Sequence, residues 1–156
     1  MAKAAPDHPV DTVSDAALRR FVGYNLKRAF NALQADLSST LEPFGLRMLT
    51  FSALALIVEN PGLRPSQLAE ALSVERANVA VYVDQLEEAG WVTRRPSVQD
   101  RRAYALHATL SGARVYGRAS QAVERHDRRM LAGLREADLA AVNRTFAAIE
   151  AQGKGA

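Results

Sequence analysis

Basic side chains gather in one short stretch, residues 91–102, where their charge could bind a polyanion. The stretch has a net charge of +3 because it contains four arginines and one acid: Arg94, Arg95, Arg101 and Arg102, with Asp100. Arginines on a narrow hairpin can enter the minor groove of DNA, where the electrostatic potential is most negative. The carboxylate of Asp100 can hold Arg102 in one pose through a bidentate pair. A solvated charged turn is the alternative that the charges alone leave open.

Two helices are predicted just before this stretch, at 65–72 and 77–90, with a break at 73–76. In the second helix, Val79, Val83 and Leu86 recur at positions i, i+4 and i+7, so they form a stripe that faces the core. This stripe is expected to pack against Leu68, Leu72 and Val74. The opposite face is then available to a partner, and it carries Arg76, Ala77, Asn78, Ala80, Val81, Asp84 and Gln85.

The side chains on that opposite face suit the edges of DNA bases. Asn78 can pair with adenine through two hydrogen bonds, and Arg76 can bind guanine or a phosphate. Small apolar side chains such as Val81 fit thymine methyl groups, and they are unusual on a face that meets only solvent. Ser66 and Gln67, at the start of the first helix, are placed to donate to phosphates. An ordinary solvated helix face is the alternative.

Two extended segments, 91–95 and 103–108, follow the helix pair and are predicted to form a hairpin across residues 96–102. A helix pair followed by such a hairpin is a winged helix-turn-helix, whose second helix can enter the DNA major groove. Acidic and basic residues balance over 64–102, and Glu75 and Asp84 count against heavy phosphate contact by the second helix. The predicted DNA contacts are Ser66, Gln67, Arg76, Ala77, Asn78 and Val81, with Arg94, Arg95, Asp100, Arg101 and Arg102.

The composition is that of one folded domain of 156 residues, 48% of them hydrophobic. The absence of cysteine excludes disulfides, thiolate metal sites and a cysteine redox switch. The three histidines are scattered, so neither a metal nor another cofactor is expected. The longest wholly apolar run, 53–58, is too short for a bilayer, and the first residues lack the apolar core of a signal peptide. A cytoplasmic protein is therefore expected.

Apolar residues at helical spacing predict long helices on both sides of the winged helix-turn-helix. They run over about 15–41, 47–59, from about 110 onward, and 136–151. The fold class is thus mainly α with a small β-hairpin wing. The expected divisions are a flexible arm at 1–13, helical dimerisation segments at 14–45 and 110–151, the DNA-binding domain at 46–109 and a disordered tail at 152–156. Helices with uncovered apolar seams favour a homodimer; packing within one chain is the alternative.

Several motifs together resemble the MarR family of bacterial winged-helix regulators. They are Leu68-Ala69, Leu86-Glu87-x-x-Gly90, Trp91-Val92-x-Arg94-Arg95, Asp100-Arg101-Arg102 and Thr109-x-x-Gly112. The resemblance covers about residues 15–150. It implies a homodimer on a pseudo-palindromic operator, with the second helix in the major groove and the hairpin in the minor groove. It also implies that Arg102 is the wing-tip arginine and Asp100 its anchor. Ala108, Arg64, Ala80 and Val81 depart from the residues usual in the family.

The resemblance further implies a ligand cleft between the dimer helices and the DNA-binding domain. The candidate residues are Tyr24, Arg28, Phe44, Arg47, Phe51 and Tyr116. Aromatic rings beside an arginine suit an aromatic carboxylate or a phosphate-bearing thioester. The stretches 46–51, 60–62 and 100–107 are similar to family members that control aromatic-acid degradation, some of which respond to hydroxycinnamoyl-CoA. The alternative is that the aromatic residues belong to the core and Arg28 is a surface charge.

These observations favour a ligand-responsive transcriptional regulator, a repressor that binds operator DNA as a homodimer and is released by a small aromatic acid or its CoA thioester. The expected partners are double-stranded DNA, a second copy and that ligand, with no membrane. A second hypothesis is a dimeric small-molecule-binding or interaction protein that has lost specific DNA readout. An enzyme is not expected, because the sequence shows no catalytic constellation.

Overall fold

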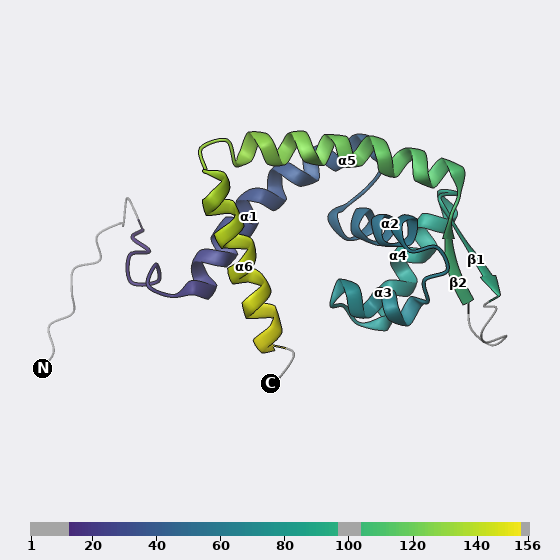
Figure 1. Cartoon of the computed structure of the whole chain (residues 1–156), viewed down its shortest axis with the longest axis horizontal. Helices are drawn as coiled ribbons and strands as arrows, with labels where there is room; N and C mark the ends of the chain where they lie inside the picture. The colour runs from purple at the N-terminus through teal and green to yellow at the C-terminus, as the bar shows by residue number, and fades with distance from the viewer. Residues whose placement is uncertain (1–12, 97–103, 154–156) are drawn as a thin grey trace, which may run out of the picture. The chain divides into compact units, whose positions relative to one another are not determined.

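A computed structural model describes residues 13–96 and 104–153 of the chain. The main chain runs through helices α1 (Val22–Leu41), η1 (Glu42–Phe44), α2 (Met48–Glu59), α3 (Pro65–Leu72) and α4 (Arg76–Glu88). Strands β1 (Val92–Pro96) and β2 (Tyr104–Ala108) follow, and helices α5 (Leu110–Met130) and α6 (Glu136–Gly153) complete the fold (Figure 1). The predicted class, mainly α with a two-stranded antiparallel hairpin, is confirmed.

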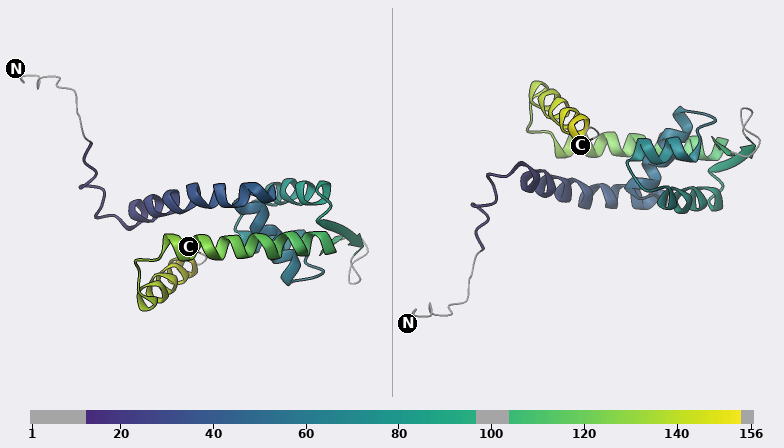
Figure 2. Two further views of the ribbon diagram at one scale, coloured as in Figure 1. Left: turned by 90° about the horizontal axis from the view of Figure 1, so that it is seen from above. Right: turned by 90° about the horizontal axis from the view of Figure 1, so that it is seen from below.

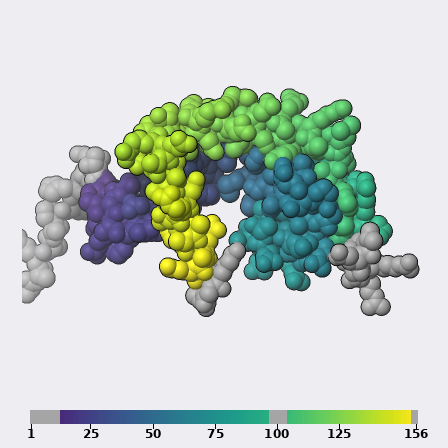
Figure 3. Space-filling view, viewed as in Figure 1, coloured from purple at the N-terminus to yellow at the C-terminus, as the bar shows by residue number. Residues whose placement is uncertain are grey.

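The chain divides into two compact units, residues 1–35 and 36–156. The second unit holds the hydrophobic core, to which α2, α3, α4, the hairpin and α5 all contribute. Ala53, Leu54 and Ile57 of α2 are fully buried at its centre. Figure 3 shows the teal part of the chain, with α2, α3 and α4, as one closely packed body. The core residues are Leu41, Leu46, Ala53, Leu54, Ile57, Leu68, Ala69, Val79, Val83, Leu86, Val92, Leu106 and Ala119.

Residues with positive φ, two glycines and one serine, lie at the ends of three helices of the second unit. Gly45 ends η1 with φ of 67°, and Gly90 follows α4 with φ of 73°. Ser73 closes α3 in the left-handed region at φ of 53°, where its N–H reaches the carbonyl oxygens of Ala69 and Glu70. These changes of direction allow α3 and α4 to contact α2 and each other. From α2 onward, each predicted helix or strand is present within about two residues of its predicted bounds.

The predicted start of the first helix, near residue 15, is wrong. Residues 16–20 form turns, and α1 begins at Val22. The Asn25 side-chain amide donates to the carbonyl oxygen of Arg19 at 2.7 Å, which is the acceptor that the Gly23 N–H would use in a continuous helix. Asp15 binds the Tyr24 hydroxyl at 2.8 Å and Arg19 at 2.9 Å, and these bonds hold the turn in place.

The long helix α5 starts at the hairpin, as Figures 1 and 2 show. Its predicted apolar stripe is buried toward the core at Ala119 and His126, whereas Met130 at its end is exposed. The His126 Nδ1 atom lies 2.9 Å from Asp127 Oδ1, and its Nε2 atom lies 3.3 Å from Asp36 Oδ2. Asp36 also pairs with Arg129. These contacts fasten the last part of α1 to α5 within the second unit.

Both terminal helices carry exposed apolar side chains. On α6, Val142, Phe146 and Ile149 are 40%, 40% and 43% exposed. In the first unit, Phe21, Val22 and other apolar side chains of the segment 18–30 are likewise exposed. Within the described ranges, no single helix is both long and apolar enough to cross a membrane. One bent pair, Val22–Phe44 with Met48–Glu59, meets the length and composition criteria when taken together.

Candidate nucleic-acid interface

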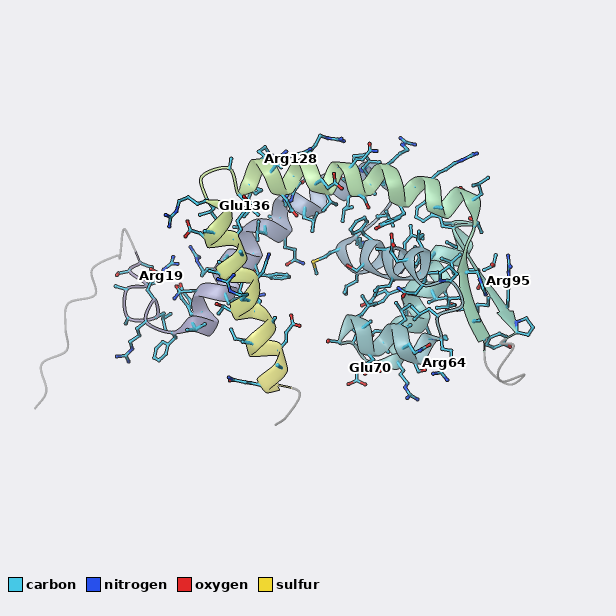
Figure 4. The ribbon with its side chains drawn as sticks, viewed as in Figure 1. Arg19, Arg64, Glu70, Arg95, Arg128 and Glu136 are labelled. Atoms are coloured by element: carbon cyan, nitrogen blue, oxygen red, sulfur yellow. The ribbon has the colours of Figure 1, made fainter. Side chains whose placement is uncertain are left out.

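Helices α3 and α4 border a groove of about 830 Å³ on the surface of the second unit. Four of the residues predicted to contact DNA line this α3–α4 groove: Ser66, Gln67, Arg76 and Asn78. All four are exposed. The groove also contains Arg64, Glu70 and Glu75, so its charges balance. Figure 4 shows Glu70 of α3 and Arg64, the residue before α3, projecting outward.

The packing of α4 fixes which of its faces meets a partner. Val79, Val83 and Leu86 are each 1% exposed, so the predicted core stripe is confirmed. Ala77 and Val81 lie on the other side of the helix and are exposed, Val81 by 51%. Val81 is not part of the hydrophobic core, so its exposed methyl groups can make the apolar contact that a thymine methyl group requires. The structure therefore brings the predicted base-reading side chains onto one exposed surface.

Main-chain and side-chain donors are found among the residues that line this groove. The cap residue of α4, Glu75, makes no side-chain hydrogen bond to the first turn, and the Asn78 N–H donates to the Glu75 carbonyl oxygen at 3.0 Å, so the N–H groups of Arg76 and Ala77 are the ones without a capping side chain. Gln67 Oε1 accepts the backbone N–H of Arg64 at 3.0 Å and its Nε–H at 3.2 Å. Because the oxygen is used in this way, the amide NH₂ group of Gln67 remains to donate outward. These are the donors that a phosphate-lined partner needs.

The two arginines of β1 have different surroundings, because successive strand residues point to opposite faces. Arg95 is exposed, and Figure 4 shows it extending away from the helices. Arg94 instead binds the carboxylates of two α4 residues: Asp84, and Glu87 at 2.6 Å. The hydrogen bond to Asp84, more than the charge of Glu87, raises the pKa of Arg94 above its ordinary value. Arg94 was predicted as a DNA contact, and the structure places its guanidinium against protein carboxylates.

Three predicted wing residues, Asp100, Arg101 and Arg102, lie outside the described residues. The hairpin that leads to them is described on both sides, with Val92 opposite Ala108 and Pro96 opposite Tyr104. Leu106 also bridges to Leu63 in the loop before α3, so β2 lies between β1 and that loop. This arrangement fixes the base of the wing to the helix pair.

The junction of the hairpin with α5 is held by one threonine. The Thr109 hydroxyl accepts the Gly112 N–H at 3.0 Å and donates to the carbonyl oxygen of Gly90 at 2.8 Å. The Thr109 N–H donates to the carbonyl oxygen of Trp91 at 2.9 Å. One residue thus caps α5 and ties it to the chain that leaves α4. The Thr-x-x-Gly motif is therefore the N-terminal cap of α5.

Four of the candidate ligand residues, Phe44, Arg47, Phe51 and Tyr116, belong to the second unit. Phe44, Phe51 and Tyr116 pack against the core of the second unit, with the Phe51 and Tyr116 ring centres 6.0 Å apart. Arg118 lies over the Phe44 ring at 5.7 Å. Arg47 instead lines a shallow hollow of about 390 Å³ with residues that include Gly45, Thr50, Gln85 and Glu88. These three rings take part in the packing around the core, and the ligand role predicted for them stays a prediction.

The other two ligand candidates belong to the first unit. The Tyr24 hydroxyl donates to Asp15, and this hydrogen bond raises the pKa of Tyr24 and lowers that of Asp15. Arg28 is exposed, and its charge also lowers the pKa of Asp15. The Tyr24 hydroxyl is therefore engaged within its own unit.

Comparison with known proteins identifies the family. A model of the MarR family matches residues 46–104, from just before α2 to the first residue of β2. A relative from Thauera aromatica, assigned to transcriptional regulation of the hcr operon, is 36% identical over 118 residues, which are 75% of this chain and 71% of the relative. The chain belongs to the MarR family. It is therefore a member of a family of transcriptional regulators, as the motifs predicted.

Solved structures of other MarR regulators have the same fold. The transcriptional repressor CouR, bound to a 23-mer DNA duplex, matches with a TM-score of 0.84 and 30% identity over 90% of this chain and 99% of CouR. CouR from Rhodococcus jostii RHA1, bound to p-coumaroyl-CoA, matches with a TM-score of 0.79 and 27% identity over 86% of this chain and 95% of that one.

Within the described ranges, no group of three acidic or histidine side chains could hold a metal ion.

Proposed function

We propose that this MarR protein is a repressor that binds operator DNA as a homodimer and releases it when a small aromatic acid or its CoA thioester binds. The observation that carries the proposal is the α3–α4 groove, where Ser66, Gln67, Arg76 and Asn78 are exposed together. A similar repressor of known structure, CouR, binds a DNA duplex.

The assignment of DNA contacts follows from where these side chains lie. Asn78, Ala77 and Val81 face the base edges of the major groove, Arg76 binds a guanine or a phosphate, and Ser66 and Gln67 donate to the DNA backbone. Arg95, Arg101 and Arg102 bind in the adjacent minor groove, with Asp100 as the anchor of Arg102.

The homodimer is supported by the apolar surfaces of the terminal helices. Val142, Phe146 and Ile149 form a seam along α6 that the described part of the same chain leaves exposed. A symmetric partner covers such a seam with the same residues of a second copy. We therefore assign the helices outside residues 46–109 to dimerisation.

The proposed ligand class rests on the relatives and on the aromatic residues of the second unit. CouR from R. jostii binds p-coumaroyl-CoA. The T. aromatica relative is described as a transcriptional regulatory protein for the hcr operon. Phe44, Phe51 and Tyr116 are only partly buried where they pack on the core, so their rings keep exposed surface on which an aromatic ligand could stack. A ligand releases DNA only if it binds the DNA-free state of the dimer more tightly than the DNA-bound state.

The test is a titration of the protein against labelled DNA from upstream of its own gene, with random DNA as control. The same titration is repeated with aromatic acids and their CoA thioesters, p-coumarate and p-coumaroyl-CoA first. We expect tight binding to one DNA only, relieved by one compound. Asn78→Ala should weaken specific binding by about 1–3 kcal/mol and random binding little. Gln121→Ala, at an exposed position of α5, is the matched control and should leave both unchanged.

A second function, a dimeric interaction protein without specific readout, is favoured by one observation. The exposed face of α4 is largely apolar or neutral, and Arg94 beside it is paired with carboxylates. Equal and weak binding to both DNAs, with a shallow dependence on salt, would support this function instead.

A further inference from the structure

The ion pair between the wing and helix α4 involves the face of α4 that we assign to DNA. Ala77, Val81 and Asp84 follow one another at i, i+4 and i+7, so they share one stripe of the helix. The Asp84 side chain is 64% exposed. A free carboxylate on this stripe would repel DNA phosphates, and the repulsion would be felt over several ångströms.

Arg94 reaches this carboxylate from the neighbouring strand. Its guanidinium binds Asp84 with one nitrogen and Glu87 with the other, the latter at 2.6 Å. The Arg94 side chain is 30% exposed, less than either partner, so the strand side of the pair is the more enclosed. A planar guanidinium can bind two carboxylates at once through two different nitrogens, whereas a lysine has only one nitrogen to share between them.

The backbone of β1 strengthens the same link. The Leu106 N–H donates to Leu63 and the Leu106 carbonyl oxygen accepts the Gly62 N–H, so both main-chain groups of Leu106 point away from β1. Arg94, which pairs with Leu106 across the hairpin, therefore has an N–H that points away from β2. Glu87 Oε1 accepts this N–H at 3.3 Å. Glu87 thus binds both the main chain and the side chain of Arg94.

We propose that Arg94 is a positioning residue, which neutralises Asp84 on the DNA-facing stripe and holds the wing strand against α4, and that it does not itself contact DNA. The neighbouring Arg95, exposed on the opposite face of β1, acts on DNA directly. This assignment rests on the proposed DNA-binding function. It also gives Asp84 a defined role, since its charge is cancelled within the protein.

The test compares charge-removing variants of the two arginines with and without Asp84→Asn. The probe is the duplex that the wild-type protein selects from a random-sequence pool, and affinity is measured by fluorescence anisotropy. We expect Arg94→Gln to weaken binding about tenfold because it exposes the Asp84 and Glu87 charges. Adding Asp84→Asn should restore affinity to within about threefold of the wild type, and Arg94→Lys should lose less than Arg94→Gln.

Arg95→Gln is the matched control, because it removes the same charge one residue away. If Asp84→Asn improves Arg95→Gln as much as it improves Arg94→Gln, the rescue is only a general charge effect and the proposal is overturned. It is also overturned if the Asp84→Asn/Arg94→Gln double variant binds no better than Arg94→Gln alone.

Thermal unfolding of the same variants without DNA separates this proposal from the proposed function. The two substitutions at Asp84 and Arg94 should be non-additive in their effect on melting temperature, because the two side chains contact each other. Additive effects would refute the role of Arg94 in holding β1 against α4. If the wild type selects no duplex but the effects of the Asp84 and Arg94 substitutions on melting temperature are non-additive, the proposed DNA-binding function fails, whereas the role of Arg94 in holding β1 against α4 stands.

Discussion

Replacing Gly112 by alanine should destabilise the protein, although alanine is the better helix former. Gly112 lies in the first turn of α5, where a Cβ atom would come within 2.1 Å of the carbonyl oxygen of Trp91 and 2.8 Å of its carbonyl carbon. Both are backbone atoms, so no side-chain rotation can relieve the overlap. The start of α5 must instead move away from Trp91, the residue before β1.

The size of the effect can be worked out from three terms. The overlap should cost about 1–3 kcal/mol, as over-packing does in other cores. The shift would weaken the hydrogen bond from Thr109 to Trp91, now 2.9 Å long, at a cost of about 1 kcal/mol. The higher helix propensity of alanine returns about 1 kcal/mol. The net loss is about 1–3 kcal/mol, which for a chain of this size lowers the melting temperature by roughly 2–12 °C.

Urea denaturation and thermal melting would measure this loss, with Gly117→Ala as the matched control. Gly117 lies in the same helix, and nothing approaches its Cβ position within 4 Å. The control should therefore gain about 0.5–1 kcal/mol from helix propensity alone. The reasoning is refuted if the Gly112 variant proves as stable as the Gly117 variant.

Three further outcomes are expected. Thr109→Ala should lower the free energy of unfolding by about 1 kcal/mol in urea titrations, because it removes the cap of α5; unchanged stability would contradict that role. Phe146→Glu should shift the protein toward a monomer in sedimentation experiments, because it puts a charge into the apolar seam of α6; an unchanged mass would exclude α6 from the interface. Tyr24→Phe should raise the lowered pKa of Asp15 toward its ordinary value in an NMR titration. Since the Asp15 pKa is lowered in the folded state, the bond it makes stabilises the turn above the ordinary carboxyl pKa and is lost as the pH falls through the folded value; an unmoved pKa would argue against the bond.

The helix-turn-helix could be predicted because its sequence signals are local. Pro65 in the first turn of α3 and Gly90 after α4 mark boundaries by backbone geometry alone. The stripe formed by Val79, Val83 and Leu86 has the helical period and becomes fully buried. The start of α1 could not be found in the same way. It depends on the bonds made by Asp15 and by the Asn25 side chain, and no periodicity reveals those.

The exposed faces of the site were predictable, but the partners of individual charges were not. Asn78 and Val81 had to be exposed once the buried stripe of α4 was known. The pairing of Arg94 with Asp84 and Glu87 depends on how the hairpin packs on α4, which is a tertiary property. A partial signal was present, because two acids three residues apart on a helix precede an arginine on a strand. The sequence alone could not exclude a DNA contact for that arginine.

The ion pair changes where the positive field of the wing must come from. Counted from the sequence, residues 91–102 carry a net charge of +3 from four arginines and one aspartate. Arg94 is committed to Asp84 and Glu87, so its charge does not add to the field that DNA meets. Under the proposed function, Arg95, Arg101 and Arg102 would then supply the attraction of the wing. Helix α4 would read bases mainly through Asn78 and Val81, with Arg76 at its start as its one basic side chain. Affinity should therefore depend mainly on the wing and specificity mainly on the helix, so changes at Arg95 and Asn78 should have separable effects.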